Sequence, residues 1–367
     1  MPGERRGVSI PPRGFVATHA HSFRCSQVGG RGIRVSCIIF LSAIPLALPA
    51  CTSGDIPTEP ESAPAGAVAS HALSTVDLGI PEPYSLATAL NNRGQVVGER
   101  AAAFEAPGRA FLWTRGKLTD LGTLGGLFAR AFGINERGQI VGDATTAGGQ
   151  THGFVWEKGT MRDLGTLGSD GSTAFDINNR GQIIGNSMTP LNAMHGFIWE
   201  RGVMTDLGTL GGVATFPFDL NNKGEVVGSS ITTIEPFPGQ PVDHAFLWRN
   251  GRMMDLGTLG GFFSRAHGIN DRGQVVGVSD TPNSNGELHG FLWQHGRMTD
   301  LGTDFAPQSI NNRGQIVGSN QANEVLLWER GKLHKLSELG SASEINDRGT
   351  VAGYTSAGVV RAVIWTR

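Results

Sequence analysis

The sequence predicts an all-β fold, a seven-bladed β-propeller of four-stranded antiparallel blades, and three observations support this prediction. A unit of about 43 residues recurs along the chain, and a period of this size with several strands per unit is typical of propeller blades. Each of the seven units contains one of the seven tryptophans. The two ends of the repeat region carry complementary strand fragments, as a closed ring requires and an open array does not.

The composition agrees with short strands joined by tight turns, since 54 of the 367 residues are glycine. Charged residues make up 17% of the chain, and the formal net charge is −2. Bulk charge therefore predicts no nucleic-acid partner and no direct binding to an anionic membrane. All three cysteines, Cys25, Cys37 and Cys51, precede the repeats, so the repeat region has no disulfide and no thiolate metal ligand.

The N-terminal segment has the pattern of an export signal. An apolar run over residues 35–50 follows Arg31 and Arg34 and ends in small residues. The four residues that end at Cys51 read Leu-Pro-Ala-Cys and resemble a bacterial lipobox, although Pro49 departs from that pattern. We therefore expect lipidation at Cys51. A membrane anchor formed by the apolar run, or a cleaved and unlipidated signal, are the alternatives.

These features divide the chain into three parts. Residues 1–51 form the export signal, whose long basic region is most simply explained by a misassigned start codon, with a real extension as the alternative. Residues 52–70 are rich in Pro, Ser, Ala and acids and form a flexible tether, and residues 71–367 form the propeller. We expect an extracytoplasmic monomer, lipid-anchored to the bacterial outer membrane or cell surface, with a secreted or periplasmic protein as the alternative.

The repeat unit restarts at an aspartate that is followed by Leu-Gly, and its last copy is degenerate. The seven starts are Asp77, Asp120, Asp163, Asp206, Asp255, Asp300 and Lys335. The seven tryptophans are Trp113, Trp156, Trp199, Trp248, Trp293, Trp328 and Trp365. In the second unit, strand a is predicted to end at 132–135, strand b to cover 139–143, strand c 152–157 and strand d 160–165.

The connections within a unit are of two kinds. The a–b turn at 135–138 reads Asn-Glu-Arg-Gly, and a turn that opens on asparagine and closes on a left-handed glycine is a common hairpin geometry. The c–d turn at 156–159 places its glycine in the same way, so both connections are predicted to be tight hairpins. Only the b–c loop varies, from 143–151 in this unit to the longer 229–243 in a later one.

The two ends of the repeat region are predicted to close the ring. The chain stops at the end of strand c of the seventh unit, whereas residues 73–79 form an orphan strand d ahead of the first unit. Completing the last blade with this N-terminal strand makes strand d outermost and places strand a at the central channel. Phe154 and Trp156 share one face of strand c and Val155 lies on the other, so the tryptophans are predicted to pack between blades rather than to bind a ligand.

The motifs DLGTLGG, GINxRGQIVG and His-(Ala/Gly)-Phe-Leu-Trp together resemble the bacterial extracellular HAF-repeat proteins over about residues 71–367. The resemblance implies export and a repeat architecture, and that family has no settled biochemical activity. The tripeptide itself stands at His244-Ala245-Phe246. Three other units have His-Gly-Phe in its place, beginning at His152, His195 and His289. The remaining three units have no histidine at this position and carry Arg109, Glu324 and Arg361 instead. A required ligand is not expected to vary in this way.

The sequence offers no recognisable catalytic or metal-binding motif. The four histidines occur once per blade on a strand that is not innermost, so we expect structural hydrogen bonds from them rather than a shared ion. The sequence contains no calcium loop, no nucleophile elbow and no single phosphate-binding loop. The repeated aspartates lie on the outermost strand, where their charge opposes edge-to-edge pairing. We therefore expect no enzyme activity, no metal and no cofactor.

The variable b–c loops are the predicted ligand site, because binding usually resides in variable loops held by a rigid scaffold. The longest cover 229–243, 278–288 and 99–108. Candidate ligand-binding residues on them are Glu99, Glu105, Ile231, Glu235, Phe237, Asn283 and Glu287. The Thr, Asn, Ser and Gly content of these loops suits a glycan or a protein surface better than nucleic acid.

A ring of cations on the a–b turns is the rival site. Every turn carries one: Arg93, Arg137, Arg180, Lys223, Arg272, Arg313 and Arg348. Interpreted as function, the ring is an anion-binding rim for acidic glycans or phosphate head groups. Interpreted as architecture, each cation is a solvated turn residue that pairs with a carboxylate of the neighbouring blade or stacks on an aromatic ring. We favour this interpretation because a periodic residue usually belongs to the repeat itself.

The predicted function is therefore non-enzymatic binding or scaffolding at the cell surface. An exported polysaccharide hydrolase or lyase with its site on the b–c face is the alternative, because propellers host both roles. Two convergent carboxylates with raised pKa values in one cleft of that face would favour the enzyme.

Overall fold

The computed structural model describes residues 73–236, 239–282, 287–356 and 358–366, all of which belong to the repeat region. Cys51, the tether at 52–70, Phe237 and Asn283 lie outside the described residues. Every regular element in the described part of the chain is a β-strand, and no helix in it could cross a membrane.

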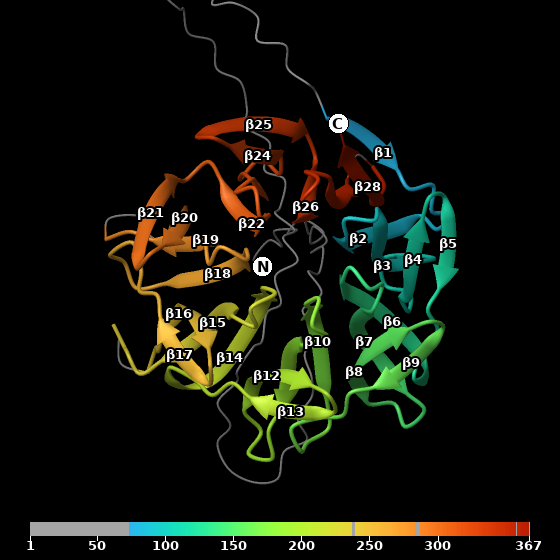
Figure 1. Cartoon of the computed structure of the whole chain (residues 1–367), viewed down its shortest axis with the longest axis horizontal. Coiled ribbons are helices and arrows are strands. Elements are labelled where there is room, and N and C mark those ends of the chain that lie inside the picture. Colours follow the sequence, from blue (N-terminus) through green and yellow to red (C-terminus); the bar gives the residue numbers. More distant parts are fainter. Residues whose placement is uncertain (1–72, 237–238, 283–286, 357, 367) are drawn as a thin grey trace, which may run out of the picture. The chain divides into compact units, whose positions relative to one another are not determined.

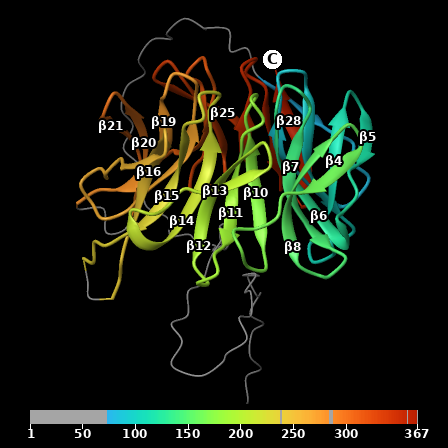
Figure 2. The same ribbon diagram turned by 60° about the horizontal axis from the view of Figure 1, so that its bottom comes forward.

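The strands form seven four-stranded antiparallel sheets that surround a central channel (Figures 1 and 2). Blade 1 contains β2 (Tyr84–Leu90), β3 (Gln95–Ala101), β4 (Arg109–Thr114) and β5 (Lys117–Asp120). Blade 2 contains β6 (Gly125–Ile134), β7 (Ile140–Thr146), β8 (Thr151–Glu157) and β9 (Thr160–Asp163). Blade 3 contains β10 (Ser172–Ile177), β11 (Ile183–Met188), β12 (Met194–Glu200) and β13 (Val203–Asp206). Blade 4 contains β14 (Gly211–Leu220), β15 (Val226–Thr232), β16 (Asp243–Arg249) and β17 (Arg252–Asp255).

The remaining three blades repeat the same order from the channel outward. Blade 5 contains β18 (Ser264–Ile269), β19 (Val275–Asp280), β20 (Leu288–Gln294) and β21 (Arg297–Gly302). Blade 6 contains β22 (Ala306–Ile310), β23 (Ile316–Ser319), β24 (Val325–Glu329) and β25 (Lys332–Ser337). Blade 7 contains β26 (Gly340–Ile345), β27 (Val351–Thr355), β28 (Arg361–Thr366) and the N-terminal β1 (Ser74–Asp77).

The N-terminal strand closes the ring as predicted. β1 pairs antiparallel with β28, from Ser74 opposite Thr366 to Asp77 opposite Val363, and Figure 1 shows the blue β1 beside the red β28. Strand a of each blade lies innermost, and strand d lies at the outer edge. The prediction of a closed seven-bladed propeller is confirmed.

The inner strand of every blade contains a β-bulge. In blade 2 the pairing of β6 with β7 shifts between Ala131 and Gly133, and the other six inner strands shift at the equivalent place. A bulge adds one residue to one strand of a pair, so each inner strand can present two successive side chains at the channel. The last glycine of the GQIVG motif is required beside this bulge, because a Cβ on Gly142 would lie 1.9 Å from the backbone oxygen of Arg130.

Both hairpin turns are tight, as predicted, but their geometries differ. The a–b turn of blade 2 has one left-handed residue, Gly138 at φ 79°. The c–d turn has two, Lys158 at φ 52° and Gly159 at φ 89°, between the paired residues Glu157 and Thr160. Two left-handed residues define a type I′ turn, whose twist matches that of the flanking strands. The same glycine placement therefore served two different turns, and the sequence did not distinguish them.

The core consists of apolar layers between neighbouring blades. The cluster between blades 1 and 2 combines Val97 and Ala110 of the first blade with Ile140 and Phe154 of the second, and Trp156 packs against it. Trp156 remains partly exposed, whereas Trp365 in the closing blade is fully buried. Because each blade is covered on both faces, this architecture needs no disulfide to build a large core.

Candidate functional site

The connections of the propeller emerge on two faces. We call the face with the b–c loops and the d–a connections the b–c face, and the face with the a–b and c–d turns the a–b face. The long b–c loops are shorter than predicted: they cover 102–108, 233–242 and 281–287, because strands b and c pair further. Glu99 and Ile231 are therefore strand residues on β3 and β15 rather than loop residues, paired opposite Ala110 and Asp243.

Three other predicted residues lie in exposed loops of different blades. Glu105 belongs to blade 1, Glu235 to blade 4 and Glu287 to blade 5, and all three are exposed. The Glu235 carboxylate accepts a hydrogen bond of 3.0 Å from the backbone N–H of Gly239 within its own loop. Glu287 accepts one of 3.3 Å from the side chain of Gln321 in the next blade. The contact of Glu235 stabilises its own loop, and that of Glu287 joins two neighbouring blades.

Glu99 belongs to a partly buried cluster where the inner strands reach the b–c face. The Arg130 guanidinium lies 2.8 Å from Asp143 and 3.9 Å from Glu99, and it packs over the rings of Phe128 and Phe132 at 4.9 and 5.2 Å. Burial raises the pKa of Glu99, an effect that Arg130 opposes. Two carboxylates thus converge on this face, and the single guanidinium of Arg130 lies within ion-pair distance of both.

The same cluster is continuous with the exposed surface through two aromatic residues. Burial raises the pKa of Tyr84, which hydrogen-bonds to Glu99. The Phe104 ring packs edge-on against Tyr84 with centroids 5.4 Å apart, although Phe104 itself is 68% exposed. A partly buried polar cluster therefore supports an exposed aromatic side chain on this face.

Exposed apolar side chains gather on the b–c face. Of the thirteen large apolar residues that are exposed in the described chain, nine lie in b–c loops, in d–a connections or in the strand ends next to them. These nine, which we call the apolar ring, are Phe104, Leu127, Leu191, Val213, Ile234, Phe262, Leu288, Leu339 and Val359. The other four, Val76, Val203, Met254 and Leu333, lie on outermost strands. Exposed large apolar side chains are therefore more frequent on the b–c face than on the a–b face of the described chain.

The histidines of strand c pair with the aspartates of strand d. The Nδ1 atom of His152 lies 2.7 Å from the Asp163 carboxylate, and His195, His244 and His289 make the same contact within their blades. Blade 6 reverses the charges, with Lys335 Nζ 3.1 Å from Glu324. In blade 1 an arginine takes the place of the histidine, with Arg109 Nε 3.6 Å from Asp120. The aspartates therefore have paired partners, which the sequence analysis missed although the two positions are eleven residues apart in each of these blades.

Asparagines of the a–b turns form a closed ring on the opposite face. The Nδ2 atom of each one donates to the backbone oxygen of the corresponding asparagine in the next blade, at 2.9–3.1 Å. The seven are Asn91, Asn135, Asn178, Asn221, Asn270, Asn311 and Asn346. Each Oδ1 also accepts backbone N–H groups of its own turn, as Asn178 does from Arg180 and Gln182. Sequence reasoning assigned these residues only a turn-forming role.

The predicted cations lie on the outside of this ring. All seven are exposed, and the backbone N–H of each donates to the asparagine of its own turn. Arg180 extends toward the next blade and donates a hydrogen bond of 3.3 Å to the backbone oxygen of Lys223. The mouth of the channel is instead lined by asparagines and by acids that include Glu136, Asp271 and Asp347. The cations thus surround the face without lining the mouth.

Three carboxylates lie inside the channel next to the bulges, at positions the sequence analysis did not identify. Burial raises the pKa of Glu344 to about 8, and burial together with the neighbouring Asp176 raises that of Asp219 well above its usual value. Asp219 accepts a hydrogen bond of 2.7 Å from the backbone N–H of Ile269 in the next blade. Glu344 accepts one of 2.9 Å from the backbone N–H of Leu90, which also belongs to a neighbouring blade. These side chains join neighbouring inner strands. In the described residues no three His, Cys, Asp or Glu side chains are placed to hold a metal ion.

The comparisons with known proteins show the fold. The propeller domain of the trilobed protease from Pyrococcus furiosus, described as having an open velcro topology, matches with a TM-score of 0.56 and 8% identity over 77% of this chain and 93% of that chain. YCF48 bound to D1 peptide matches with a TM-score of 0.50 and 11% identity over 82% and 96% of the two chains. The acylaminoacyl peptidase of Pyrococcus horikoshii matches with a TM-score of 0.51 and 10% identity. That match covers 78% of this chain but only 53% of the peptidase. No protein-family model and no curated protein matches the chain.

Proposed function

We propose that this protein is a non-enzymatic, extracytoplasmic binding or scaffold protein that presents the b–c face of its propeller to a partner protein. The apolar ring is the observation that supports the proposal. Its members come from most of the blades, and several are highly exposed: Leu191 at 90%, Leu127 at 78% and Phe104 at 68%. Exposing so much apolar surface on one face is unfavourable in water unless a partner covers it.

The chemistry of the ring favours a protein over a glycan as the partner. Leu127, Leu191, Val213 and Val359 offer no hydrogen-bonding groups, and a hydroxyl-rich ligand would be desolvated against them without compensation. An apolar centre with polar groups around it is the usual composition of a protein interface. The exposed Glu105, Glu235 and Glu287 in the neighbouring loops supply such a polar rim.

The alternative function, hydrolysis or cleavage of a polysaccharide, would depend on Glu99 and Asp143. Arg130 lies between these two carboxylates and is bonded to Asp143 through Nε and Nη2, at 3.2 and 2.8 Å. This geometry supports a role in holding β6 against β7. Turnover of a polysaccharide by the wild type, abolished by Glu99→Gln in a variant that still folds, would contradict the binding proposal.

The test of the proposed function is selective capture on the apolar ring. A variant with Phe104→Ser, Leu127→Ser and Phe262→Ser is compared with a control that carries Met254→Ser and Leu333→Ser on outer strands. Each is photo-crosslinked in a cell-envelope extract, and the captured proteins are identified by mass spectrometry. We expect a partner that the wild type and the control capture and the ring variant does not. Equal capture by the ring variant, with both variants folded, would contradict the proposal.

The export part of the proposal rests on the sequence alone. The lipobox-like segment and the resemblance to HAF-repeat proteins support a location outside the cytoplasm, with Cys51 as the lipidated residue. Cys51→Ala is expected to release the protein from the membrane fraction and leave the propeller folded. A mutant that stays membrane-bound would identify the apolar run at 35–50 as the anchor instead.

A further inference from the structure

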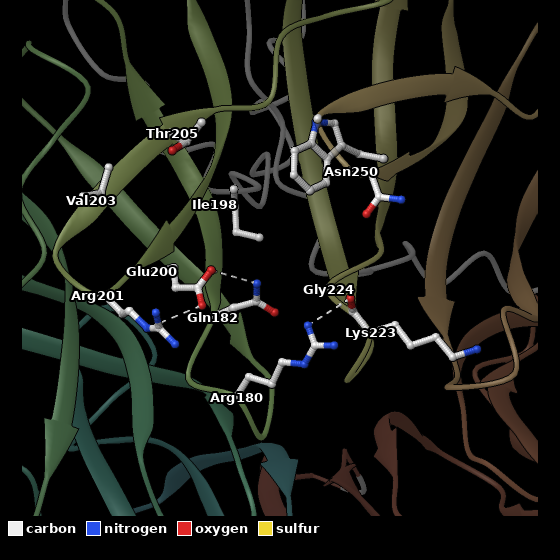
Figure 3. Close-up of a pocket in the computed structure, with 12 residues that line it drawn as sticks. Arg180, Gln182, Ile198, Glu200, Arg201, Val203, Thr205, Lys223, Gly224 and Asn250 are labelled. Carbon is white, nitrogen blue, oxygen red and sulfur yellow. Dashed lines mark hydrogen bonds and ion pairs between the residues drawn. The ribbon is translucent and has the colours of Figure 1, made fainter.

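A groove opens on the a–b face between blades 3 and 4, away from the apolar ring (Figure 3). Its volume is about 640 Å³, which lies within the range of small-molecule sites. Ile198 and Val203 of blade 3 and the half-buried Trp248 of blade 4 supply its apolar surface. Gln182, Thr205 and Asn250 supply neutral hydrogen-bonding groups.

Two side chains explain why the groove is open at this junction. Val203 is the first residue of β13, and the residues at the same position in the other blades are longer or polar: Ser74, Lys117, Thr160, Arg252, Arg297 and Lys332. Asn250 is the first left-handed residue of its c–d turn, where the other blades have Arg115, Lys158, Arg201, His295 and Arg330. Among the described blades, only the junction of blades 3 and 4 combines the short, uncharged residues Val203 and Asn250.

The charge of the groove is positive. Figure 3 shows Arg180, Arg201 and Lys223 around it, with Glu200 as its one carboxylate. Glu200 is already compensated, because Arg201 Nε lies 3.9 Å away and Gln182 Nε2 donates to it at 3.1 Å. In the described part of the chain no carboxylate lies within ion-pair distance of Arg180 or Lys223, which are two members of the cation ring.

We propose that this groove binds a short segment of an acidic carbohydrate, with a uronate carboxylate held at Arg180. The guanidinium of Arg180 at the rim can hold a carboxylate through charge-assisted hydrogen bonds. The indole of Trp248 and the side chain of Val203 form an apolar surface against which the C–H groups of a sugar ring can pack. The surrounding amides and hydroxyl match the hydroxyl groups of such a ring. The proposal does not depend on the function proposed for the b–c face.

The test uses an oligogalacturonate tetramer as the probe and measures its dissociation constant by calorimetry. The neutral galactose tetramer and a tetraglutamate peptide are measured alongside it. We expect the uronate to bind and both comparison ligands to bind at least about tenfold more weakly. The galactose tetramer lacks the carboxylate that forms the charge-assisted contact, and tetraglutamate lacks the sugar ring that packs on Trp248. Tetraglutamate binding as tightly as the uronate would overturn the carbohydrate assignment.

Two matched variants separate the groove from general positive charge. Val203→Lys fills the groove with the residue type that other blades carry there, while it adds a positive charge. Thr160→Lys adds the same charge at the same strand position in blade 2. We expect uronate affinity to fall about tenfold or more in Val203→Lys and to stay unchanged or rise slightly in Thr160→Lys. Equal or stronger binding by Val203→Lys, or no binding by the folded wild type, would overturn the proposal.

Discussion

The Nδ2 atom of Asn346, in the last blade, donates a hydrogen bond of 3.1 Å to the backbone oxygen of Asn91, in the first blade. This bond completes the ring of seven asparagines across the place where the two ends of the propeller meet. A second series of hydrogen bonds runs beside the first. In it, the side chain of Asn312 accepts a hydrogen bond from the backbone N–H of Asp271, and the side chain of Asp347 accepts one from the backbone N–H of Asn312. That series has a gap at the closure, since Asn92 Oδ1 is buried without a hydrogen-bond partner. The second series of contacts therefore does not continue across the joint between blades 7 and 1.

Removing one asparagine of the ring is expected to destabilise the propeller. Asn178 is 5% exposed, and Asn178→Ala removes its bond to Asn221 and the acceptor of its own turn. The expected loss is on the order of 2 kcal/mol in the free energy of unfolding, because two partly buried N–H groups and one buried carbonyl lose their partner. Urea unfolding followed by tryptophan fluorescence measures it.

Asn178→Asp separates the ring from the turn, because it keeps the acceptor for the turn and loses the donor to the next blade. We expect it to lose part of the stability. An Asn178→Asp protein as stable as the wild type would show that these asparagines shape their own turns only.

Deleting residues 71–79 is expected to lower the melting temperature and to cause aggregation. β28 pairs with β1 on its outer side, so the deletion exposes an unpaired strand edge in blade 7. Differential scanning calorimetry and light scattering measure the two effects. Deletion of the tether at 52–70 is the control and should leave the melting temperature unchanged; an unchanged value for the first deletion would contradict the closure.

The pairing of His244 with Asp255 is expected to make stability depend on pH. The hydrogen bond to Asp255 raises the pKa of His244 against the effect of burial. Burial alone would raise the pKa of Asp255, but hydrogen bonds from His244 and Gly257 lower it overall. The contribution of the histidine is complete below its unfolded pKa of about 6.5 and is lost as the pH rises through the folded value. The contribution of the aspartate is lost as the pH falls below about 4.

His244→Gln should therefore reduce stability most near pH 5 and least above pH 8. Chemical unfolding of wild type and variant across this range measures the difference. His334→Gln on the exposed side of β25 serves as the control. A loss that does not change with pH would show that the pair contributes only a neutral hydrogen bond.

Burial of Glu344 is expected to cause a further loss of stability as the pH rises. Burial raises its pKa to about 8, and Asp176 and Glu136 add to the effect. Between the unfolded pKa of about 4.3 and the folded value, the folded state holds a proton that the unfolded state has lost, so stability falls as the pH rises. In Glu344→Gln the side chain is neutral at every pH, and its amide oxygen can still accept the hydrogen bond from the backbone N–H of Leu90.

We expect Glu344→Gln to match the wild type near pH 4.5 and to exceed its stability increasingly toward pH 8. Unfolding experiments at several pH values check this, with the exposed Glu235→Gln as the control. A constant difference across the range would mean that Glu344 is ionised in the folded protein.

Much of the architecture could be predicted because the repeat makes one local pattern visible seven times. The turn residues, the strand order and the role of residues 73–79 all follow from the sequence, since hairpin geometry and ring closure are set by local chain chemistry and by counting strands. The b–c loops differ in length in the structure, and their role in ligand binding stays a prediction. The strands at Glu99 and Ile231 were predicted too short, because polar strand ends do not show how far pairing continues.

The contacts between blades could be decided only by the tertiary structure. Asn178 reaches Asn221, Glu344 reaches Leu90 and Arg180 reaches Lys223 because the radial packing of sheets brings equivalent positions of different units together. The exposure of individual apolar side chains could not be predicted from the sequence either. Leu127 and Ile134 are both aliphatic, yet Leu127 is 78% exposed and Ile134 is 6% exposed. The sequence by itself determined the strands, their order and the closed ring, since these depend on local residues and on their period. Which side chains meet across the joints, line the groove or form the apolar ring depends on the spacing and orientation of whole sheets, which only the folded structure sets.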